Sequence, residues 1–226
     1  FISIKFVYKI VNIIMDHKIV KNLNIINSEI ISKKKETKII AVSKTFPMES
    51  IIPLINHGHI HYGENKVQEA VEKWEKIKNV NNKIKLHLIG KLQTNKVKFA
   101  VKIFDYIHSL DSEKLAKKIS SFQQSQNLKI FIQVNIGDEH QKSGIHESKL
   151  FEFYDLCKGL KLNVIGLMCI PPIDGDTNIY FRKMRELKNK YNFKELSMGM
   201  SSDYLNAIEF ESSYLRIGSS IFGKRD

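Results

Sequence analysis

The stretch "KIIAVSKTFP", residues 38–47, indicates a buried strand that ends on a lysine. Apolar and largely β-branched residues run without interruption up to Ser43, whereas a strand at the surface would alternate apolar and polar residues. Lys44 follows at once. Its ammonium group either reaches solvent along its apolar stem or lies in a functional site. The flanking sequence helps to decide whether Lys44 is exposed to solvent or belongs to a site.

Seven more apolar runs follow this one, separated by longer, amphipathic, lysine-rich segments with helical spacing. The eight runs cover residues 38–43, 59–63, 84–90, 106–110, 129–136, 163–170, 194–200 and 214–223. Regular alternation of strands and helices implies right-handed parallel crossovers. Eight such units in this length predict an α/β fold, a single (β/α)8 TIM-type barrel. A doubly wound open sheet is the alternative, because a count of strands does not establish closure.

The length and the cysteines limit the class of protein. The 226 residues can bury a full core without disulfides or metals, and residues 157 and 169 are the two cysteines. They form no CxxC pair, which favours a reduced, cytoplasmic protein. No apolar stretch is long and clean enough to span a bilayer.

The first residues, "FISIKFVYKIVNIIMDHK", are apolar but contain two lysines and no small-residue cleavage site, so we do not expect a secretory signal. Met15 is a candidate start residue. We therefore expect residues 1–14 to be an N-terminal extension, either upstream read-through or a poorly ordered segment of the protein, and residues 15–226 to form the barrel.

The formal net charge of +12 raises the question of a nucleic-acid partner. The lysines are dispersed along the chain, and no basic run is interleaved with aromatic residues, so we expect no nucleic-acid role. Arginine is scarce and occurs only at positions 182, 185, 216 and 225. An arginine inside an apolar run, as Arg216 is, is therefore more informative than any lysine.

Two glycine- and serine-rich loops are candidates for phosphate binding. In barrels of this kind the chemistry lies at the carboxyl ends of the strands, and phosphate often binds at the loops after strands seven and eight. Here those loops are "MGMSSD" (198–203) and "RIGSS" (216–220). Gly199 and Gly218 allow close approach of the backbone, and Ser201 and Ser219 offer hydroxyls. The alternative is that these are ordinary small-residue turns and caps.

Arg216 and Lys44 add charge at the same rim. A buried guanidinium needs a partner, either a neighbouring acid in the core or a heteroatom of a ligand. A lysine in a dry barrel mouth has a lowered pKa and can act as a nucleophilic amine that condenses with an aldehyde. A phosphate cradle opposite such a lysine suits pyridoxal 5′-phosphate (PLP) or a phosphorylated aldehyde sugar, and spacing alone does not decide between them.

Other site patterns are weaker. The histidines of "HGHIH", at positions 57, 59 and 61, suggest a metal because His59 and His61 would share a strand face. No third ligand follows at a motif spacing, so we expect no metal site. "IGKLQT" is no P-loop, since Lys85 stands where the first glycine is required. No Ser/His/Asp or Cys/His signature is present.

Seven segments, taken together and in order, resemble the pyridoxal phosphate homeostasis protein family. They are "AVSKTFP", "GENKVQEA", "HLIGKLQTNKVK", "IQVNIGDEHQKSGI", "GLMCIPP", "LSMGMSSDYLNAIE" and "RIGSSIFGKR". That family is similar to the N-terminal barrel of alanine racemase. The resemblance runs from about residue 38 to residue 225, and the first fourteen residues have no family counterpart.

The resemblance implies roles for six residues toward PLP. Lys44 would form the Schiff base, Arg216 would face the pyridine nitrogen, and Asn65 would lie beside the cofactor. Residues 201, 218 and 219 (Ser, Gly and Ser) would hold the phosphate. A guanidinium at the ring nitrogen keeps it unprotonated, which makes the ring a weaker electron sink.

Two positions depart from the family pattern. Ser219 stands where a threonine is usual after "RIG" and keeps the hydroxyl. Glu211 stands where a glycine is usual before the serine, which bears on the local turn.

The resemblance implies a PLP-binding protein that holds and delivers PLP in intracellular vitamin B6 and amino-acid homeostasis. We expect no catalysis and no membrane or nucleic-acid partner, but PLP-dependent client enzymes and a monomer or weak dimer. The alternative is a PLP-dependent amino-acid racemase, which needs a proton carrier on each face of the substrate carbon. In alanine racemase the opposing tyrosine comes from a C-terminal β domain, whereas this chain stops at Asp226, soon after the eighth run. Tyr62 or Tyr204 could replace that tyrosine, but no motif places either one.

Overall fold

The structure is a computed structural model that describes residues 17–33, 36–122, 127–139 and 143–223. The predicted N-terminal extension, residues 1–14, lies outside the described residues. No helix in the described part of the chain is both long enough and apolar enough to cross a membrane.

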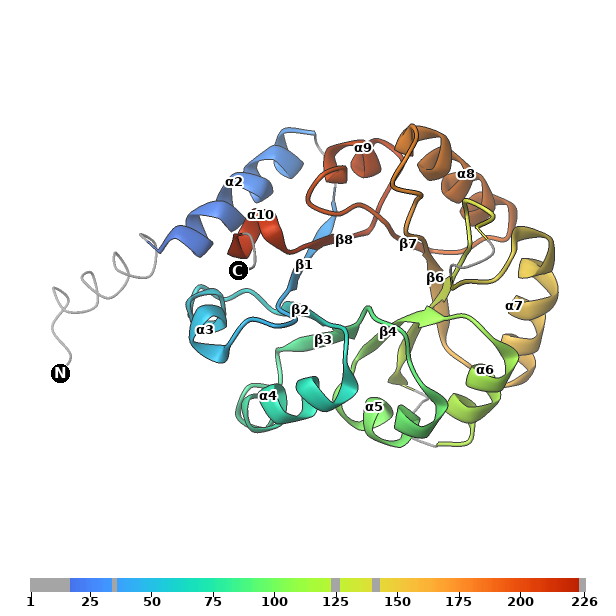
Figure 1. The fold of residues 1–226 in the computed structure, drawn as a ribbon, viewed down its shortest axis with the longest axis horizontal. Helices are drawn as coiled ribbons and strands as arrows, with labels where there is room; N and C mark the ends of the chain where they lie inside the picture. The colour runs from blue at the N-terminus through green and yellow to red at the C-terminus, as the bar shows by residue number, and fades with distance from the viewer. Residues whose placement is uncertain (1–16, 34–35, 123–126, 140–142, 224–226) are drawn as a thin grey trace, which may run out of the picture.

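Eight parallel strands close into a barrel, seen down its axis in Figure 1. They are β1 (Lys38–Val42), β2 (His61–Glu64), β3 (Lys85–Leu88), β4 (Tyr106–Leu110), β5 (Lys129–Gln133), β6 (Val164–Met168), β7 (Glu195–Ser197) and β8 (Tyr214–Ile217). Each strand pairs with the next, and β1 pairs with β8 over Lys38–Tyr214 to Ala41–Ile217. The predicted barrel is confirmed, and this closure rules out the open sheet.

Helices surround the barrel on its outside (Figure 1). They are α2 (Lys18–Ser32), α3 (Met48–Asn56), α4 (Val67–Val80), α5 (Val97–Ile103), α6 (Glu113–Ser120), α7 (Leu150–Gly159), α8 (Thr177–Lys190), α9 (Tyr204–Glu209) and α10 (Ser219–Phe222), with short 3-10 turns at Thr94–Lys96 and Glu147–Lys149. The amphipathic pattern explains this placement, because each helix turns one apolar stripe onto the sheet. Trp74 of α4 and Phe181 of α8 are fully buried in this way.

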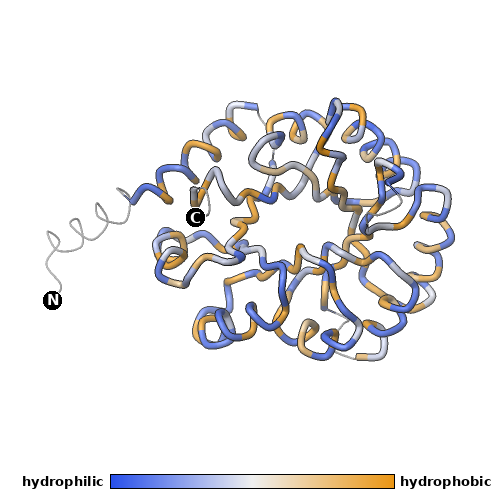
Figure 2. The backbone as a smooth tube through the Cα atoms, viewed as in Figure 1, coloured by the Kyte–Doolittle hydropathy of each residue, from blue (hydrophilic) through white to orange (hydrophobic). Residues whose placement is uncertain are grey.

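The buried apolar side chains of the described residues form two hydrophobic cores. The larger one lies between the sheet and the helices. The smaller one lies inside the barrel and consists of Ile40, Tyr106, Phe131, Met168 and Tyr214. Figure 2 shows the corresponding hydrophobic segments along the strands that encircle the centre. The barrel interior is therefore a packed core with aromatic residues rather than an open pore.

Helix α2 covers the barrel beside the carboxyl-terminal helix α10, as Figure 1 shows. Its buried residues Val20, Leu23, Ile26 and Ile30 recur at helical spacing and face the core. The Asn22 side chain donates to the backbone oxygen of Ile221 at 2.9 Å. This contact fixes α10, and with it the loop that follows β8.

Two sequence expectations need correction. The eighth apolar run, 214–223, is not one strand: β8 ends at Ile217, Gly218 leaves the extended conformation, and α10 begins at Ser219. An apolar run of ten residues does not by itself distinguish a strand from a strand followed by a helical turn. The expectation that His59 and His61 share a strand face is also wrong, because β2 begins only at His61.

Candidate functional site

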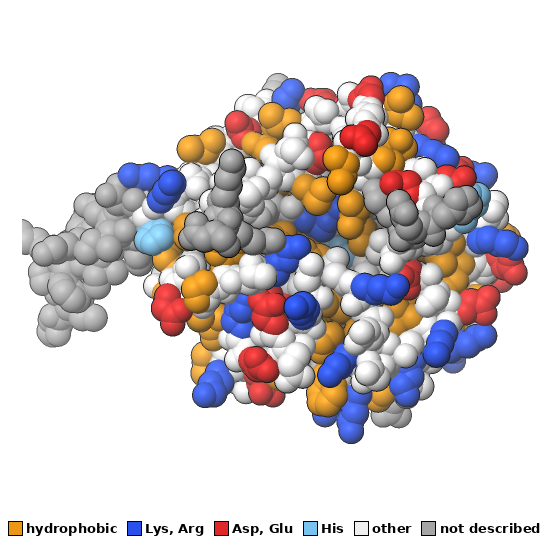
Figure 3. All heavy atoms as spheres, in the orientation of Figure 1, with side chains coloured by type: hydrophobic (Ala, Val, Ile, Leu, Met, Phe, Trp, Pro, Cys, Tyr) orange, Lys and Arg blue, Asp and Glu red, His pale blue; other side chains and the backbone are white. Residues whose placement is uncertain are grey.

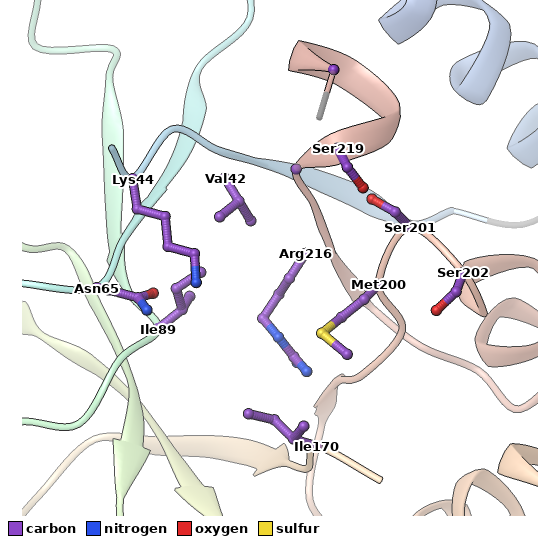
Figure 4. A pocket seen from close by; sticks show the side chains of 12 residues that line it. Val42, Lys44, Asn65, Ile89, Ile170, Met200, Ser201, Ser202, Arg216 and Ser219 are labelled. Atoms are coloured by element: carbon purple, nitrogen blue, oxygen red, sulfur yellow. The ribbon is translucent and has the colours of Figure 1, made fainter. Parts of the chain in front are cut away.

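One cavity at the carboxyl-terminal mouth of the barrel brings together all six residues that the sequence singles out. Its volume is about 650 Å³, within the range of small-molecule sites. Its lining residues are Val42, Lys44, Asn65, Ile89, Ile170, Met200, Ser201, Ser202, Arg216, Gly218, Ser219 and Gly223. In Figure 4 the Lys44 side chain points into the cavity from one side, Ser201 and Ser219 lie across from it, and Arg216 lies between them.

The loop that carries Lys44 is held by helix α4. The backbone oxygen of Ser43 accepts a hydrogen bond from Lys73 Nζ at 2.9 Å, and the Thr45 N–H donates to Glu69 Oε1 at 2.7 Å. Thr45 has a φ of 68°, a left-handed conformation that is unfavourable for a β-branched residue. The contacts on both sides of Lys44 stabilise this turn and so fix the direction of its side chain.

Lys73 belongs to a small buried charge cluster, which we call the α4 clamp: Ser43, Glu64, Glu69, Lys73 and Trp74. Lys73 Nζ lies 3.0 Å from Glu64 Oε1 and 3.1 Å from Glu69 Oε1. The same Glu64 oxygen accepts from Ser43 Oγ at 2.7 Å and from Trp74 Nε1 at 3.0 Å. Burial raises the pKa of Glu64, while its three donors oppose that shift. Glu64 enters this cluster through one carboxylate oxygen, since its Oε2 has no hydrogen-bond partner in the described part of the chain.

Asn65 follows β2 and is held against the loop after β3. A Cβ atom on Gly90 would stand 2.4 Å from the backbone oxygen of Asn65 and 2.8 Å from its Cα. The two loops can approach this closely only because residue 90 is glycine. This contact places the Asn65 side chain at the cavity wall, near Lys44 in Figure 4.

The two serine loops meet at the opposite wall. Ser201 Oγ accepts a hydrogen bond from the Ser220 N–H at 3.2 Å, which ties the loop after β7 to the start of α10. Gly199 has a φ of +91°, and a Cβ atom there would lie 2.6 Å from that of Ala207. This glycine lets the chain turn sharply between β7 and α9. As a result Ser201 and Ser219 present their hydroxyls to one side of the cavity.

Arg216 is buried, with 5 % of its surface exposed. Its Nη1 donates to Ser197 O at 2.6 Å and to Ser197 Oγ at 2.9 Å, and its Nη2 donates to Cys169 O at 2.8 Å. Among the described residues, no carboxylate lies within salt-bridge distance of it. Burial lowers the pKa of the guanidinium, and the neighbouring Cys169 and Asp203 oppose that shift. Of the two partners expected for Arg216, a core acid is thus ruled out within the described chain.

The cavity favours an anion. None of its described lining residues is Asp or Glu, whereas Lys44 and Arg216 bring positive charge and the serines and Asn65 bring hydrogen-bond donors. Figure 3 shows basic side chains in and around the central hollow of this face. Positive charge together with hydrogen-bond donors attracts an anion, because hydrogen bonds to a charged acceptor are stronger than those to a neutral one. The donor set therefore suits a ligand that carries phosphate and a carbonyl group.

Sequence reasoning missed the residues that support this site. Apart from Ser43, the residues of the α4 clamp lie within "GENKVQEAVEKW" (63–74), where the acids and Lys73 look like an ordinary solvated helix face. Ser197 ends β7 and Cys169 directly follows β6, and only the fold brings them to Arg216. An i,i+4 spacing of Glu69 and Lys73 was the one local signal available.

The histidines that suggested a metal do not gather as ligands. Within the described ranges, no group of three or more His, Cys, Asp or Glu residues is arranged to hold a metal ion. The His59 ring shares a 2.8 Å hydrogen bond with the backbone oxygen of His61, and His57 pairs with Asn24 at 3.1 Å. These contacts tie the segment before β2 to its surroundings.

Comparison with known proteins supports the same fold and family. The family described as alanine racemase, N-terminal domain, matches residues 14–226. A pyridoxal phosphate homeostasis protein of Aquifex aeolicus is 40% identical over 200 residues, which cover 83% of this chain and 87% of that protein. One of Vibrio alginolyticus is 38% identical over 205 residues, 85% of this chain and 88% of that protein.

Solved structures of similar proteins have the same barrel fold. PipY of Synechococcus elongatus without PLP superimposes with a TM-score of 0.79 at 32% identity, over 91% of this chain and all of that one. PipY with PLP bound gives 0.75. Alanine racemase of Acinetobacter baumannii, at 17% identity and a TM-score of 0.71, shares the fold over 90% of this chain and 60% of its own. From its barrel, its motifs and these relatives, the chain belongs to the pyridoxal phosphate homeostasis protein family.

Proposed function

We propose that the chain binds PLP in the cavity at the carboxyl-terminal mouth, and that it holds and delivers this cofactor in intracellular vitamin B6 and amino-acid homeostasis. The observation that carries the proposal is the convergence of Lys44, Asn65, Arg216 and the two serine loops on one cavity, whose described lining includes no carboxylate. Relatives at 38–40% identity are named for PLP homeostasis, and PipY has been solved with PLP bound.

The residues of the cavity fit PLP by their chemistry. Ser201, Ser219 and the backbone at Gly218 would hold the phosphate, since hydroxyl and N–H donors suit a charged phosphate oxygen. Arg216 would face the pyridine nitrogen, and Asn65 would lie beside the ring. These roles favour PLP over a phosphorylated sugar because a sugar has no ring nitrogen for the guanidinium.

Lys44 would make the covalent contact. The aldehyde of PLP supplies an electrophilic carbon that condenses with a primary amine. The α4 clamp fixes the backbone on both sides of Lys44, so the amine enters the cavity in one direction. The fixed direction lowers the entropy lost when the bond forms.

We further propose that the protein does not racemise amino acids. Racemisation by two bases needs a proton carrier on each face of the substrate carbon. Among the described lining residues, Lys44 and Arg216 are the ionisable ones. The two tyrosines that could replace a second base bond elsewhere: Tyr62 OH donates to His59 O at 3.0 Å, and Tyr204 OH donates to Glu29. Both phenols lie outside the lining of the cavity.

Absorption spectroscopy combined with borohydride reduction tests the cofactor assignment. Purified protein incubated with PLP should show the visible band of a lysine-bound cofactor, and reduction should fix PLP on the peptide that contains Lys44. Lys44→Ala should lose both signals while its far-UV circular dichroism stays unchanged. Lys91→Ala is the matched control, because Lys91 lines the neighbouring cavity. This variant should keep both the visible band and the reduced PLP adduct. Label on another peptide would refute the assignment of Lys44.

A separate assay tests the proposed lack of catalysis. The PLP-loaded protein is incubated with L-alanine in deuterated water and the product is examined by chiral chromatography and mass spectrometry. We expect no D-alanine above the rate of free PLP. Formation of D-alanine that is lost in Lys44→Ala would establish a racemase instead.

The remaining partners follow from the same proposal. In its proposed cytoplasmic setting, the protein would transfer PLP to PLP-dependent client enzymes as a monomer or weak dimer. Recovery of activity by an enzyme stripped of PLP, measured against an equal amount of free PLP, tests this transfer. Light scattering across a range of protein concentrations tests the oligomeric state.

A further inference from the structure

Polar groups form a continuous hydrogen-bonded chain through the barrel interior, from the amino-terminal side to the cofactor cavity. His61 Nδ1 lies 2.9 Å from His87 Nε2, and His87 Nδ1 lies 2.9 Å from His108 Nε2. His108 Nδ1 lies 2.8 Å from Ser197 Oγ, which accepts from Arg216 Nη1 at 2.9 Å. We call His61, His87, His108 and Ser197 the histidine chain.

The chemistry of the donors gives this chain a direction. The guanidinium of Arg216 can only donate, so the Ser197 hydroxyl accepts from it and has its own proton to give. That proton goes to His108 Nδ1, which leaves Nε2–H of His108 to donate to His87 Nδ1. His87 then donates from Nε2–H to His61 Nδ1. Each contact pairs an Nδ1 with an Nε2, so one tautomer, Nε2–H, satisfies all three rings in series.

We propose that the histidine chain positions Arg216. Its single donor order orients the Ser197 hydroxyl, and that hydroxyl in turn holds the guanidinium. The same order links the cavity to the protonation state of His61 at the amino-terminal end of the barrel. None of the three histidines lines the cavity, so each would act through Ser197 and Arg216. The orientation is consistent with the charge of Arg216, because every acceptor in the chain faces toward it and every donor away from it.

Packing keeps the rings in place. The His87 ring stacks on Tyr106 at a centroid distance of 4.1 Å and an interplanar angle of 13°. The His108 ring stacks on Phe131 at 4.3 Å and 21°. Stacked rings cannot rotate freely, so a change of donor order must occur by movement of protons and not by rotation of the imidazoles.

The environment keeps the chain neutral. His87 and His108 are fully buried, and burial lowers the pKa of both rings far below the usual value; the charge of Arg216 adds to this for His108. His61 is partly exposed, and mainly burial lowers its pKa to about 4. The charged or titratable groups that face His61 from the surrounding elements are Lys38, His59, Lys85, His87, Asp105, Tyr106 and Tyr214.

Protonation of His61 would reverse the donor order of the histidine chain. A proton on His61 Nδ1 makes that atom a donor toward His87 Nε2, which already bears a proton. The contact is restored only in the state in which His87 and His108 each bear their single proton on Nδ1, so that His108 donates to Ser197 Oγ. Ser197 would then receive two donors, from His108 and Arg216, and its own proton would lose its acceptor. The position of Arg216 is thus coupled to the far end of the barrel.

Nuclear magnetic resonance of the protein without PLP tests the donor order directly. Long-range ¹H–¹⁵N spectra of histidine-labelled protein at pH 7 should show the Nε2–H tautomer at positions 61, 87 and 108, each assigned by substitution to Gln. An Nδ1–H tautomer, or a rapid mixture of the two, at His87 or His108 would overturn the proposal. Because no PLP is added, this result does not depend on the proposed function.

Variants test the coupling to the cavity. His108→Leu removes the acceptor for Ser197, so we expect PLP to dissociate about tenfold more readily and the absorption maximum of bound PLP to shift. His108→Gln keeps a neutral acceptor and donor and should restore affinity to within about twofold. The matched control is His57→Phe, which replaces a histidine outside the histidine chain and should bind PLP as wild type does.

Equal losses in the Leu and Gln variants would mean that His108 only fills space, which would refute the positioning role. If the Leu variant does not fold, the tautomer measurement and the Gln variant still decide. If wild type itself fails to bind PLP, the proposed function is refuted while the donor order stands on the spectra alone.

Discussion

The two ends of the barrel axis treat polar side chains in opposite ways. At the carboxyl-terminal mouth, Lys44, Arg216 and the serine hydroxyls face a cavity that no described carboxylate lines. Toward the amino-terminal side, His61 and His87 are packed between aromatic rings and bonded to one another. Both ends hold nitrogen-bearing side chains at the inner surface of the same sheet. The difference is in their surroundings: at one end the side chains border a cavity, and at the other they are enclosed by packed aromatic rings.

This comparison teaches how to separate a site from a polar core. A buried polar group costs free energy unless it is hydrogen-bonded, so a set of donors around a cavity indicates a ligand, whereas a closed series indicates structure. The histidines of "HGHIH", which suggested a metal, belong to the second class. Changes of pH and single substitutions at either end of the barrel test this distinction.

Acid should destabilise the histidine end most. The pKa values of His59 and His61 fall from 6.5 to about 4 on folding, mainly because of burial. Between pH 6.5 and 4 the unfolded chain therefore binds more protons than the folded one, and stability is lost as the pH falls through this window. The loss is on the order of 3 kcal/mol for each ring at pH 4. Urea unfolding at pH 7, 6 and 5 measures it.

A variant separates this effect from that of the carboxylates, which also titrate in acid. His61→Gln should unfold with a weaker dependence on pH between 7 and 5 than wild type. The same slope in both proteins would contradict the assignment of a neutral, buried His61.

Disruption of the α4 clamp should cause the second-largest loss of stability. Lys73→Met removes the cation from Glu64, whose side chain is fully buried, and we expect a loss of about 3 kcal/mol in the free energy of unfolding. PLP retention should fall as well, because the Ser43 carbonyl loses its donor beside Lys44. The urea midpoint and the borohydride-trapped fraction measure these two effects.

Lys117→Met is the matched control for the clamp. Lys117 also pairs with a glutamate four residues away, Glu113, but both side chains are about 60% exposed. An exposed pair of this kind contributes only about 0–1 kcal/mol, so this variant should remain close to wild type. Equal losses in the two lysine variants would show that burial does not strengthen the clamp.

Smaller effects are expected at the serine wall of the cavity. Ser201→Ala and Ser219→Ala should each weaken PLP binding by ~1.5–3 kcal/mol, since each removes a hydrogen bond to a charged phosphate. Pyridoxal, which lacks the phosphate, should bind almost equally to wild type and both variants. Parallel titrations with PLP and pyridoxal measure the difference. If both ligands weaken alike, the serines are turn residues and do not bind phosphate.

The smallest effect is expected at Glu211, which stands where the family pattern has glycine. Its φ of 65° confirms that this turn uses the left-handed region. Glu211→Gly relieves that strain but loses the 3.0 Å contact with Lys188 and adds freedom to the unfolded chain. We expect a net change within about 1 kcal/mol, measured as a urea midpoint. A loss above about 2 kcal/mol would mean that Glu211 has a further role.

The order of the elements and the identity of the cavity residues follow from the amino-acid pattern alone. Uninterrupted apolar runs separated by amphipathic segments predict buried parallel strands, and Lys44, Ser201 and Arg216 stand at strand ends where the motifs place them. These features are local: each depends on residues a few positions apart. The ends of the elements were harder to predict, since the apolar run 214–223 did not reveal that β8 gives way to α10 at Gly218.

The contacts that support these residues depend on the three-dimensional fold. Closure of the barrel, the α4 clamp around Lys44 and the partners of Arg216 all depend on contacts between distant segments. His108 and Ser197, for example, are 89 positions apart in the chain. No periodicity or spacing records such a pair, because hydrogen bonds across a barrel follow from the register of its strands, which only the closed sheet sets.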